Sequence, residues 1–268
     1  MWNFEHGSDR DELYQRFQVE YTIPSRCAQM LAEGSADIGI IPVAAYTSID
    51  DLLILPDVVI ASNDAVRSIL LVSKMPLEQI RTVALDSSSR SSAALVQVLF
   101  AKYWKQAAQF VSAEPQLPAM LAGNDAALLI GDPALKVDRS RYLTWDLAHE
   151  WRMFSGKPFV FAFWAVRAGA ASEDELAQVA EVFRASRDAG LEHIPEIATE
   201  WSQKLDLSPE FITSYLKDNI QYALGSENIA GMQLFFRLAS ELKLLPPAPE
   251  LRFARELEIR NSGFRNRF

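Results

Sequence analysis

Residues 81–100 read RTVALDSSSRSSAALVQVLF, and this stretch decides the fold class. The apolar run at residues 82–85 favours a buried strand, and residues 91–104 place apolar side chains at helical spacing. Five serines and Arg90 separate the two patterns. The stretch therefore predicts a strand that leads into a helix through a polar loop, which is the repeating unit of an α/β fold.

The same alternation continues on either side of this unit. Further short apolar runs predict strands at residues 17–21, 37–41, 68–73, 126–130 and 159–166. Most of these runs are continuously apolar, which is typical of strands buried on both faces of a parallel sheet. After residue 170 the pattern becomes helical, and Ser172 and Glu175 have the spacing of a capping box at the start of the first helix.

An alternation that gives way to helices favours two lobes joined by two crossing strands. We expect residues 68–73 to lead out of the first lobe and residues 159–166 to return to it. Lobe one then comprises residues 1–76 and 159–268, and lobe two comprises residues 77–158. In such folds a ligand binds beyond the carboxyl ends of the strands, between the lobes.

Composition narrows the class of partner. The chain has 268 residues, 49% of them hydrophobic, and a formal net charge of −9. This charge disfavours nucleic acid or an anionic membrane surface as the main partner. It still allows a small anion, because local donors outweigh distant charges that salt screens over about 8–10 Å. No apolar run reaches the roughly 18 residues of a membrane span.

Cysteine and histidine usage points to a cytoplasmic protein without a metal. The single cysteine, Cys27, excludes an internal disulfide and fits a reducing compartment. The start of the chain lacks the basic and apolar regions of a secretory signal. Three scattered histidines do not suggest a zinc site, so we expect no metal.

The serine loop has the chemistry of an anion site. The first amides of the following helix lack intrahelical partners, and the helix dipole adds partial positive charge there. Serine hydroxyls and Arg90 extend this donor set, which suits a carboxylate or a single phosphate. No glycine is present to wrap a polyphosphate. The alternative is a solvated loop in which Ser91 or Ser92 only caps the helix.

Other strand ends face the same region in a two-lobe fold. Ser25 lies where a helix begins, and Pro42 and Val43 follow a strand and offer backbone groups. Asp132 follows another strand. Three roles are open to it: a general base, an acceptor for a substrate hydroxyl, or the cap of a helix begun by Pro133. His149 is the only histidine near this cluster, and a lone histidine on a helix surface is usually inert.

Several segments together resemble one known family. They are DIGIIPVAAY (37–46), the serine-loop segment (68–100), LIGDPAL (129–135) and GKPFVFAFWAVR (156–167). In this order they resemble the chorismate dehydratases of the futalosine route to menaquinone, over residues 17–235. The resemblance implies a type II periplasmic-binding-protein fold used as a cytoplasmic enzyme, a carbon–oxygen lyase with no cofactor.

The implied reaction removes water from chorismate to give 3-[(1-carboxyvinyl)oxy]benzoate. The implied partner is this small dianion, so its two carboxylates need donors. We expect these substrate-binding residues: Ser25, Pro42, Val43, Ser88, Ser89, Arg90, Ser91 and Ser92. The proton acceptor is either Asp132, the expected catalytic residue, or the substrate's own enolpyruvyl carboxylate.

One departure from the family pattern leads to a further expectation. Members of the family open with a β-strand and an N-T-x-P-L-like segment, whereas Met1 and Trp2 stand just after that point. We therefore expect the sheet of lobe one to lack this first strand and to carry a gap beside its neighbours.

Three other functions fit the same resemblance in fold. One is a non-catalytic protein that binds a small carboxylate. Another is the dihydroxynaphthoate synthase of the same pathway, although the serine loop and LIGDPAL match the dehydratase better. The last is a ligand-sensing domain, but no basic DNA-binding helix pair precedes the α/β region.

Overall fold

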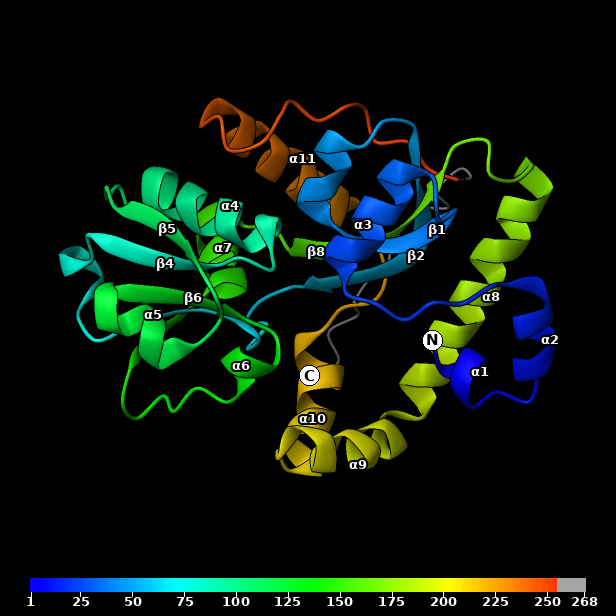
Figure 1. Ribbon diagram of the computed structural model, residues 1–268, viewed down its shortest axis with the longest axis horizontal. Helices are drawn as coiled ribbons and strands as arrows, with labels where there is room; N and C mark the ends of the chain where they lie inside the picture. The colour runs from blue at the N-terminus through cyan, green and yellow to red at the C-terminus, as the bar shows by residue number, and fades with distance from the viewer. Residues whose placement is uncertain (255–268) are drawn as a thin grey trace, which may run out of the picture.

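The computed structural model describes residues 1–254 as a mixed α/β protein with two separate sheets (Figure 1). The strands are β1 (Ile38–Pro42), β2 (Leu52–Ser62), β3 (Ile69–Ser73), β4 (Thr82–Asp86), β5 (Gln109–Ala113), β6 (Ala126–Ile130), β7 (Leu143–Asp146) and β8 (Phe159–Arg167). The helices of the first part are α1 (Trp2–Glu5), α2 (Arg10–Arg16), α3 (Pro24–Glu33), α4 (Arg90–Val98), α5 (Leu117–Gly123), α6 (Asp132–Leu135) and α7 (Leu147–Ser155). The helices that follow β8 are α8 (Glu173–Glu192), α9 (Ile194–Leu205), α10 (Pro209–Ser214) and α11 (Ser226–Glu241).

The larger sheet has five strands in the order β5-β4-β6-β3-β7. β4 runs parallel to β5 and β6, whereas β3 runs antiparallel to β6 and β7. Central residues such as Leu71 and Leu128 are paired across the sheet and fully buried. The predicted parallel sheet is therefore confirmed only for the half that contains β4.

The smaller sheet has three antiparallel strands in the order β1-β8-β2, so a parallel sheet is the wrong prediction here. β8 is continuously apolar because helices cover both of its faces. Trp164 packs edge-on against Phe183 of α8, with ring centroids 4.6 Å apart. Phe159 packs against Phe235 of α11 at 5.0 Å. Burial on both faces thus produces the same sequence pattern in a central antiparallel strand.

The two expected crossing strands each belong to one sheet only. β3 is hydrogen-bonded in the five-stranded sheet and β8 in the three-stranded sheet, so the chain passes between them through residues 63–68 and 156–158. Figure 1 shows the two sheets side by side with α11 reaching between them. The lobe boundaries given above stay a prediction, and their last part, residues 255–268, lies outside the described residues.

The strand predicted at residues 17–21 is not formed. The segment is extended, with Phe17 at φ −124° and ψ 128°, but it pairs with no described strand. A cavity of about 300 Å³ lies between residues 17–22 and the edge of β1, over Trp164 and Phe183.

Local sequence signals explain where the main helices begin. Ser172 and Glu175 form the predicted capping box of α8, in which the Glu175 carboxylate accepts from the Ser172 amide at 2.8 Å.

No helix within residues 1–254 is both long and apolar enough to cross a membrane.

Helix α11 lies close to the return segment that leads into β8. Gly231 faces the carbonyl of Pro158 so closely that a Cβ at this position would overlap the carbonyl oxygen. The same oxygen accepts a hydrogen bond from the buried Trp151 indole at 3.3 Å. Glycine is therefore required where α11 crosses the connection between the sheets.

Candidate active site

The carboxyl ends of β4 and β6 bring two of the predicted segments to one sheet edge. β4 ends at Asp86 and the parallel neighbour β6 ends at Ile130, so the serine loop and Asp132 follow adjacent strand ends. β3 is antiparallel to β6, with Ile69 opposite Ile130, so β3 begins at this same edge. The Gly131 amide donates a hydrogen bond to the Ser68 carbonyl at 2.7 Å, and this bond joins the end of β6 to the start of β3.

The serine loop begins α4 with a different cap from the one expected. Ser89 is the N-cap, and its hydroxyl accepts from the Ser92 amide at 3.3 Å, so the prediction that Ser91 or Ser92 is the cap is wrong. The helix starts at Arg90, whose amide and that of Ser91 precede the intrahelical ladder. Ser88 is exposed, and its amide donates to the Asp86 carboxylate at 2.8 Å.

The last two serines of the loop are interior residues. Ser91 and Ser92 are only 2% and 1% exposed. The Ser91 hydroxyl accepts from the Ala44 amide at 3.0 Å and so links α4 to the turn after β1. The Ser89 hydroxyl donates to the Ser92 hydroxyl at 3.2 Å. Direct contact of these two hydroxyls with a substrate stays a prediction.

We expect Ser91→Ala to lower the free energy of unfolding by about 1–2 kcal/mol, because the buried Ala44 amide loses its partner. Urea denaturation measures the change. Ser87→Ala is the matched control, since Ser87 lies in the same loop but is exposed. Equal stability of the two variants would mean that the Ser91–Ala44 bond does not hold the two parts together.

A pocket of about 250 Å³ brings three of the predicted residues together. Ser25, Pro42 and Arg90 line it from α3, the end of β1 and the start of α4. The rest of the lining consists of Ala28, Gln29, Ala32, Ala45, Ser48 and Ile49. The volume lies just below the range of about 300–1,000 Å³ for drug-sized ligands, so the pocket suits a molecule with a single ring.

The electrostatics of this pocket favour an anion. Arg90 is the only charged side chain in the lining, and no carboxylate faces it there. The N-terminus of α4 opens at the pocket with Arg90, whereas α3 lines the pocket along its side from Ser25 to Ala32. The free amides and the dipole of α4 add positive potential to the guanidinium. The arrangement can hold a carboxylate from two sides.

Two other predicted residues lie outside this pocket. Val43 is fully buried in the main core, so only its backbone is available. Asp132 is exposed and is the first residue of α6, with Gly131 as the N-cap at φ 69°. The alternative that Asp132 caps a helix begun by Pro133 is therefore wrong.

His149 is not part of the pocket lining. Its Nδ1 is 2.6 Å from the carboxylate of Asp64, which precedes β3. This hydrogen bond raises the pKa of the imidazole above its usual value. The residue is an ion-pair partner of the segment between the sheets.

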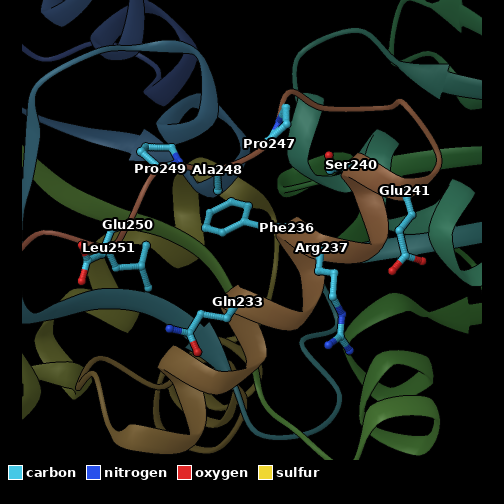
Figure 2. A pocket seen from close by; sticks show the side chains of 10 residues that line it. All are labelled: Gln233, Phe236, Arg237, Ser240, Glu241, Pro247, Ala248, Pro249, Glu250 and Leu251. Carbon is cyan, nitrogen blue, oxygen red and sulfur yellow. The ribbon is translucent and has the colours of Figure 1, made fainter.

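A second hollow, of about 480 Å³, does not fit the same ligand. Figure 2 shows it between α11 and the proline-rich residues 246–249, with Phe236 facing Ala248 at its centre. Glu241 and Glu250 line it beside Arg237, and none of the predicted site residues does. A dianion would meet two carboxylates here.

The sequence patterns missed several residues at the candidate site. Gln29 and Ser48 line the pocket, but a single polar side chain in a helix or turn gives no signal. Tyr215 donates to the Ser68 hydroxyl at 3.1 Å, a contact between residues 147 positions apart. The Asp146 carboxylate accepts from the Val66 and Arg67 amides at 3.1 and 2.6 Å. It also caps α7, and that local role was readable from the sequence.

Comparison with solved structures identifies the fold. A protein from Archaeoglobus fulgidus superposes with a TM-score of 0.71 at 16% identity, covering 88% of this chain and 93% of that one. The alkanesulfonate-binding protein of Xanthomonas axonopodis pv. citri, bound to MOPS, gives a TM-score of 0.62 at 15% identity, with coverages of 88% and 86%. The periplasmic aliphatic sulphonate binding protein of Escherichia coli gives 0.64 at 17% identity, with coverages of 91% and 89%. The chain therefore has the two-lobe periplasmic-binding-protein fold, as predicted.

Comparison of sequences identifies the family. The chorismate dehydratase of Thermus thermophilus is 28% identical over 251 residues, which are 87% of this chain and 89% of that protein. The family described as menaquinone biosynthesis matches residues 4–241, nearly all of the chain. On this match the protein belongs to the menaquinone biosynthesis family.

Proposed function

We propose that the protein is a chorismate dehydratase, a hydro-lyase that converts chorismate to 3-[(1-carboxyvinyl)oxy]benzoate and water. The observation that carries the proposal is the small pocket in which Arg90 is the only charged group, in a chain related to a chorismate dehydratase over 87% of its length. We place the reaction in the cytoplasm and in the futalosine route to menaquinone.

Substrate binding follows from the donors at the pocket. The Arg90 guanidinium and the first amides of α4 bind one carboxylate of the dianion. Ser25, in the first turn of α3, donates its hydroxyl from the other wall. The apolar lining from Ala28, Ala45 and Ile49 packs against the ring.

The chemical step needs a proton acceptor at C3 and departure of the C4 hydroxyl. Loss of both makes the ring aromatic, which favours the reaction thermodynamically. The C3 proton is acidified by conjugation to the ring carboxylate, where negative charge develops in the transition state. Donors that hold this carboxylate, such as Arg90, therefore stabilise the transition state as well as the bound substrate.

Two groups remain candidates for the proton acceptor. Asp132 follows the carboxyl end of β6, and its side chain is exposed, so it can approach a bound molecule. The second candidate is the enolpyruvyl carboxylate of chorismate itself, held next to the C3 proton.

The variant Asp132→Asn separates these candidates. If Asp132 accepts the proton, kcat falls by about a hundredfold or more while KM changes little, because an amide cannot take the proton. If the substrate carboxylate is the acceptor, kcat stays within a few-fold. Steady-state kinetics measures both constants, and equal losses in kcat and 1/KM would make Asp132 a positioning group.

The direct test is incubation of the purified chain with chorismate, followed by chromatography and mass spectrometry. The expected product is lighter than chorismate by one water molecule and carries an aromatic absorbance. Chorismate recovered unchanged from a complex would instead favour a binding protein that does not react. A chain that neither binds nor converts chorismate would exclude the proposal.

A further inference from the structure

A tyrosine from the C-terminal helices contacts the start of a strand in the five-stranded sheet. Tyr215 opens a π-helical turn (Tyr215–Asn219) directly after α10. Its phenol donates to the hydroxyl of Ser68, the residue before β3, at 3.1 Å. Both groups lie inside the protein, since Ser68 is 6% exposed and Tyr215 is half-buried or better.

The π-helical turn makes a second hydrogen bond to the connection between the sheets (residues 63–68). The Asn219 side-chain amide donates to the Ala65 carbonyl at 2.8 Å. Turns of this kind are rare and often occur at functional positions. The next tyrosine, Tyr222, differs in its role, because its phenol donates to the Leu216 carbonyl within the same region. Tyr215 is thus the residue of this pair that reaches across to the sheet edge.

Ser68 lies at the same edge of the five-stranded sheet as the serine loop and Asp132. The Ser68 carbonyl accepts from the Gly131 amide at 2.7 Å, directly beside Asp132. The strand order β4-β6-β3 places Ser68 two strands from the serine loop. At a spacing of about 4.8 Å per strand, this separation is roughly 10 Å. A molecule with one carboxylate on its ring and another on a side arm can extend from one end of this edge towards the other.

The Ser68 hydroxyl has one proton left to donate. A serine hydroxyl donates one hydrogen bond, and Tyr215 fills one of its acceptor positions. Within residues 1–254 the only side-chain hydrogen bond of Ser68 is the one that it accepts from Tyr215, although buried polar groups normally use their donors as well. Burial raises the pKa of Tyr215 by more than the hydrogen bond with Ser68 lowers it, and the charges of Asp132 and Asp146 raise it further. The phenol therefore stays protonated and keeps Ser68 in the orientation of a donor.

We propose that Ser68 donates a hydrogen bond to a substrate oxygen, a carboxylate or the leaving hydroxyl, and that Tyr215 is the positioning residue that orients it. The inference rests on the proposed function and adds a second anchor at the opposite end of the sheet edge from Arg90. Tyr215 acts only through Ser68, so the two residues form one unit.

The test compares Tyr215→Phe with Tyr222→Phe, which is the matched control. Each variant removes one buried phenol that donates one hydrogen bond, but only the first bond ends on Ser68. We expect Y215F to lower kcat/KM for chorismate by about tenfold and Y222F to leave it within twofold. Thermal denaturation of both variants checks that the folds are retained. Equal values of kcat/KM in the two variants would overturn the proposal.

A double-mutant cycle with Ser68→Ala tests whether the two residues act as a unit. S68A should lower kcat/KM by tenfold or more, and S68A/Y215F should be no worse than S68A alone. A further loss of the same size in the double variant would mean that Tyr215 acts independently of Ser68. The S68A result also decides the proposal if Y215F does not fold, since wild-type activity in S68A would exclude the anchor.

The same experiment separates this inference from the proposed function. If the wild-type chain does not convert chorismate, the proposed function fails. The anchor is then tested by calorimetry with chorismate, where Y215F must bind more weakly than Y222F. If the wild-type chain is active and Y215F matches Y222F, only the anchor fails.

Discussion

Arg90→Ala is expected to weaken chorismate binding by about 1.5–3 kcal/mol, the value of a charge-assisted hydrogen bond. This corresponds to roughly a tenfold to 150-fold rise in Kd. Arg90 supplies the only formal charge in the pocket lining, so no neighbouring cation replaces it. Calorimetry with chorismate measures the change, and kcat/KM should fall at least as far because the charge also stabilises the transition state.

Two further variants define what this result means. Arg139→Ala removes the same charge from an exposed position outside the pocket and should leave Kd within twofold. Arg90→Lys keeps the charge but loses the planar fork, so an intermediate Kd indicates bidentate binding of a carboxylate. An unchanged Kd in R90A would remove Arg90 from the site.

Gly231→Ala is expected to lower the free energy of unfolding by about 1–3 kcal/mol, because a Cβ overlaps a carbonyl that cannot move freely. That carbonyl belongs to Pro158, which leads into the central strand β8 and also accepts from Trp151. Urea denaturation measures the loss. The substitution strains the contact of α11 with the connection between the sheets.

Gly123→Ala is the control for this prediction. Gly123 is the last residue of α5, and a Cβ there meets nothing within 4 Å. Its replacement should leave stability unchanged or raise it by up to about 1 kcal/mol, through lower entropy of the unfolded chain. Equal destabilisation by both substitutions would contradict the prediction, because helix propensity favours alanine over glycine and only the contact with Pro158 distinguishes Gly231.

The sequence predicted the elements whose signals are local and strong. The strand–serine loop–helix unit and the capping box of α8 were found because their residues act on near neighbours. The missed strand β2 contains Pro56 and Asp57, the latter at φ 64°, and its pairing with β8 shifts register there. These residues interrupt the pattern that marks a strand, while the tertiary contacts still support it.

The candidate pocket was predictable only where strand and helix ends determine it. Ser25, Pro42 and Arg90 meet because the ends of elements converge on one pocket, as their sequence positions suggested. The interior role of Ser91 was not readable, because it depends on the Ala44 amide from the turn after β1. The Tyr215–Ser68 contact was equally hidden, since a tyrosine in a helical segment usually packs in the core.

The position of β8 determines the order in which the newly made protein can fold. β8 lies between β1 and β2, so neither strand has a partner in its sheet until residues 159–167 are synthesised. At roughly 5–20 residues per second, the ribosome adds the intervening segment over several seconds or more. All strands of the five-stranded sheet lie before residue 147, so they are synthesised before β8. During translation β1 and β2 therefore stay unpaired until β8 is made, and a chaperone can shield their open edges.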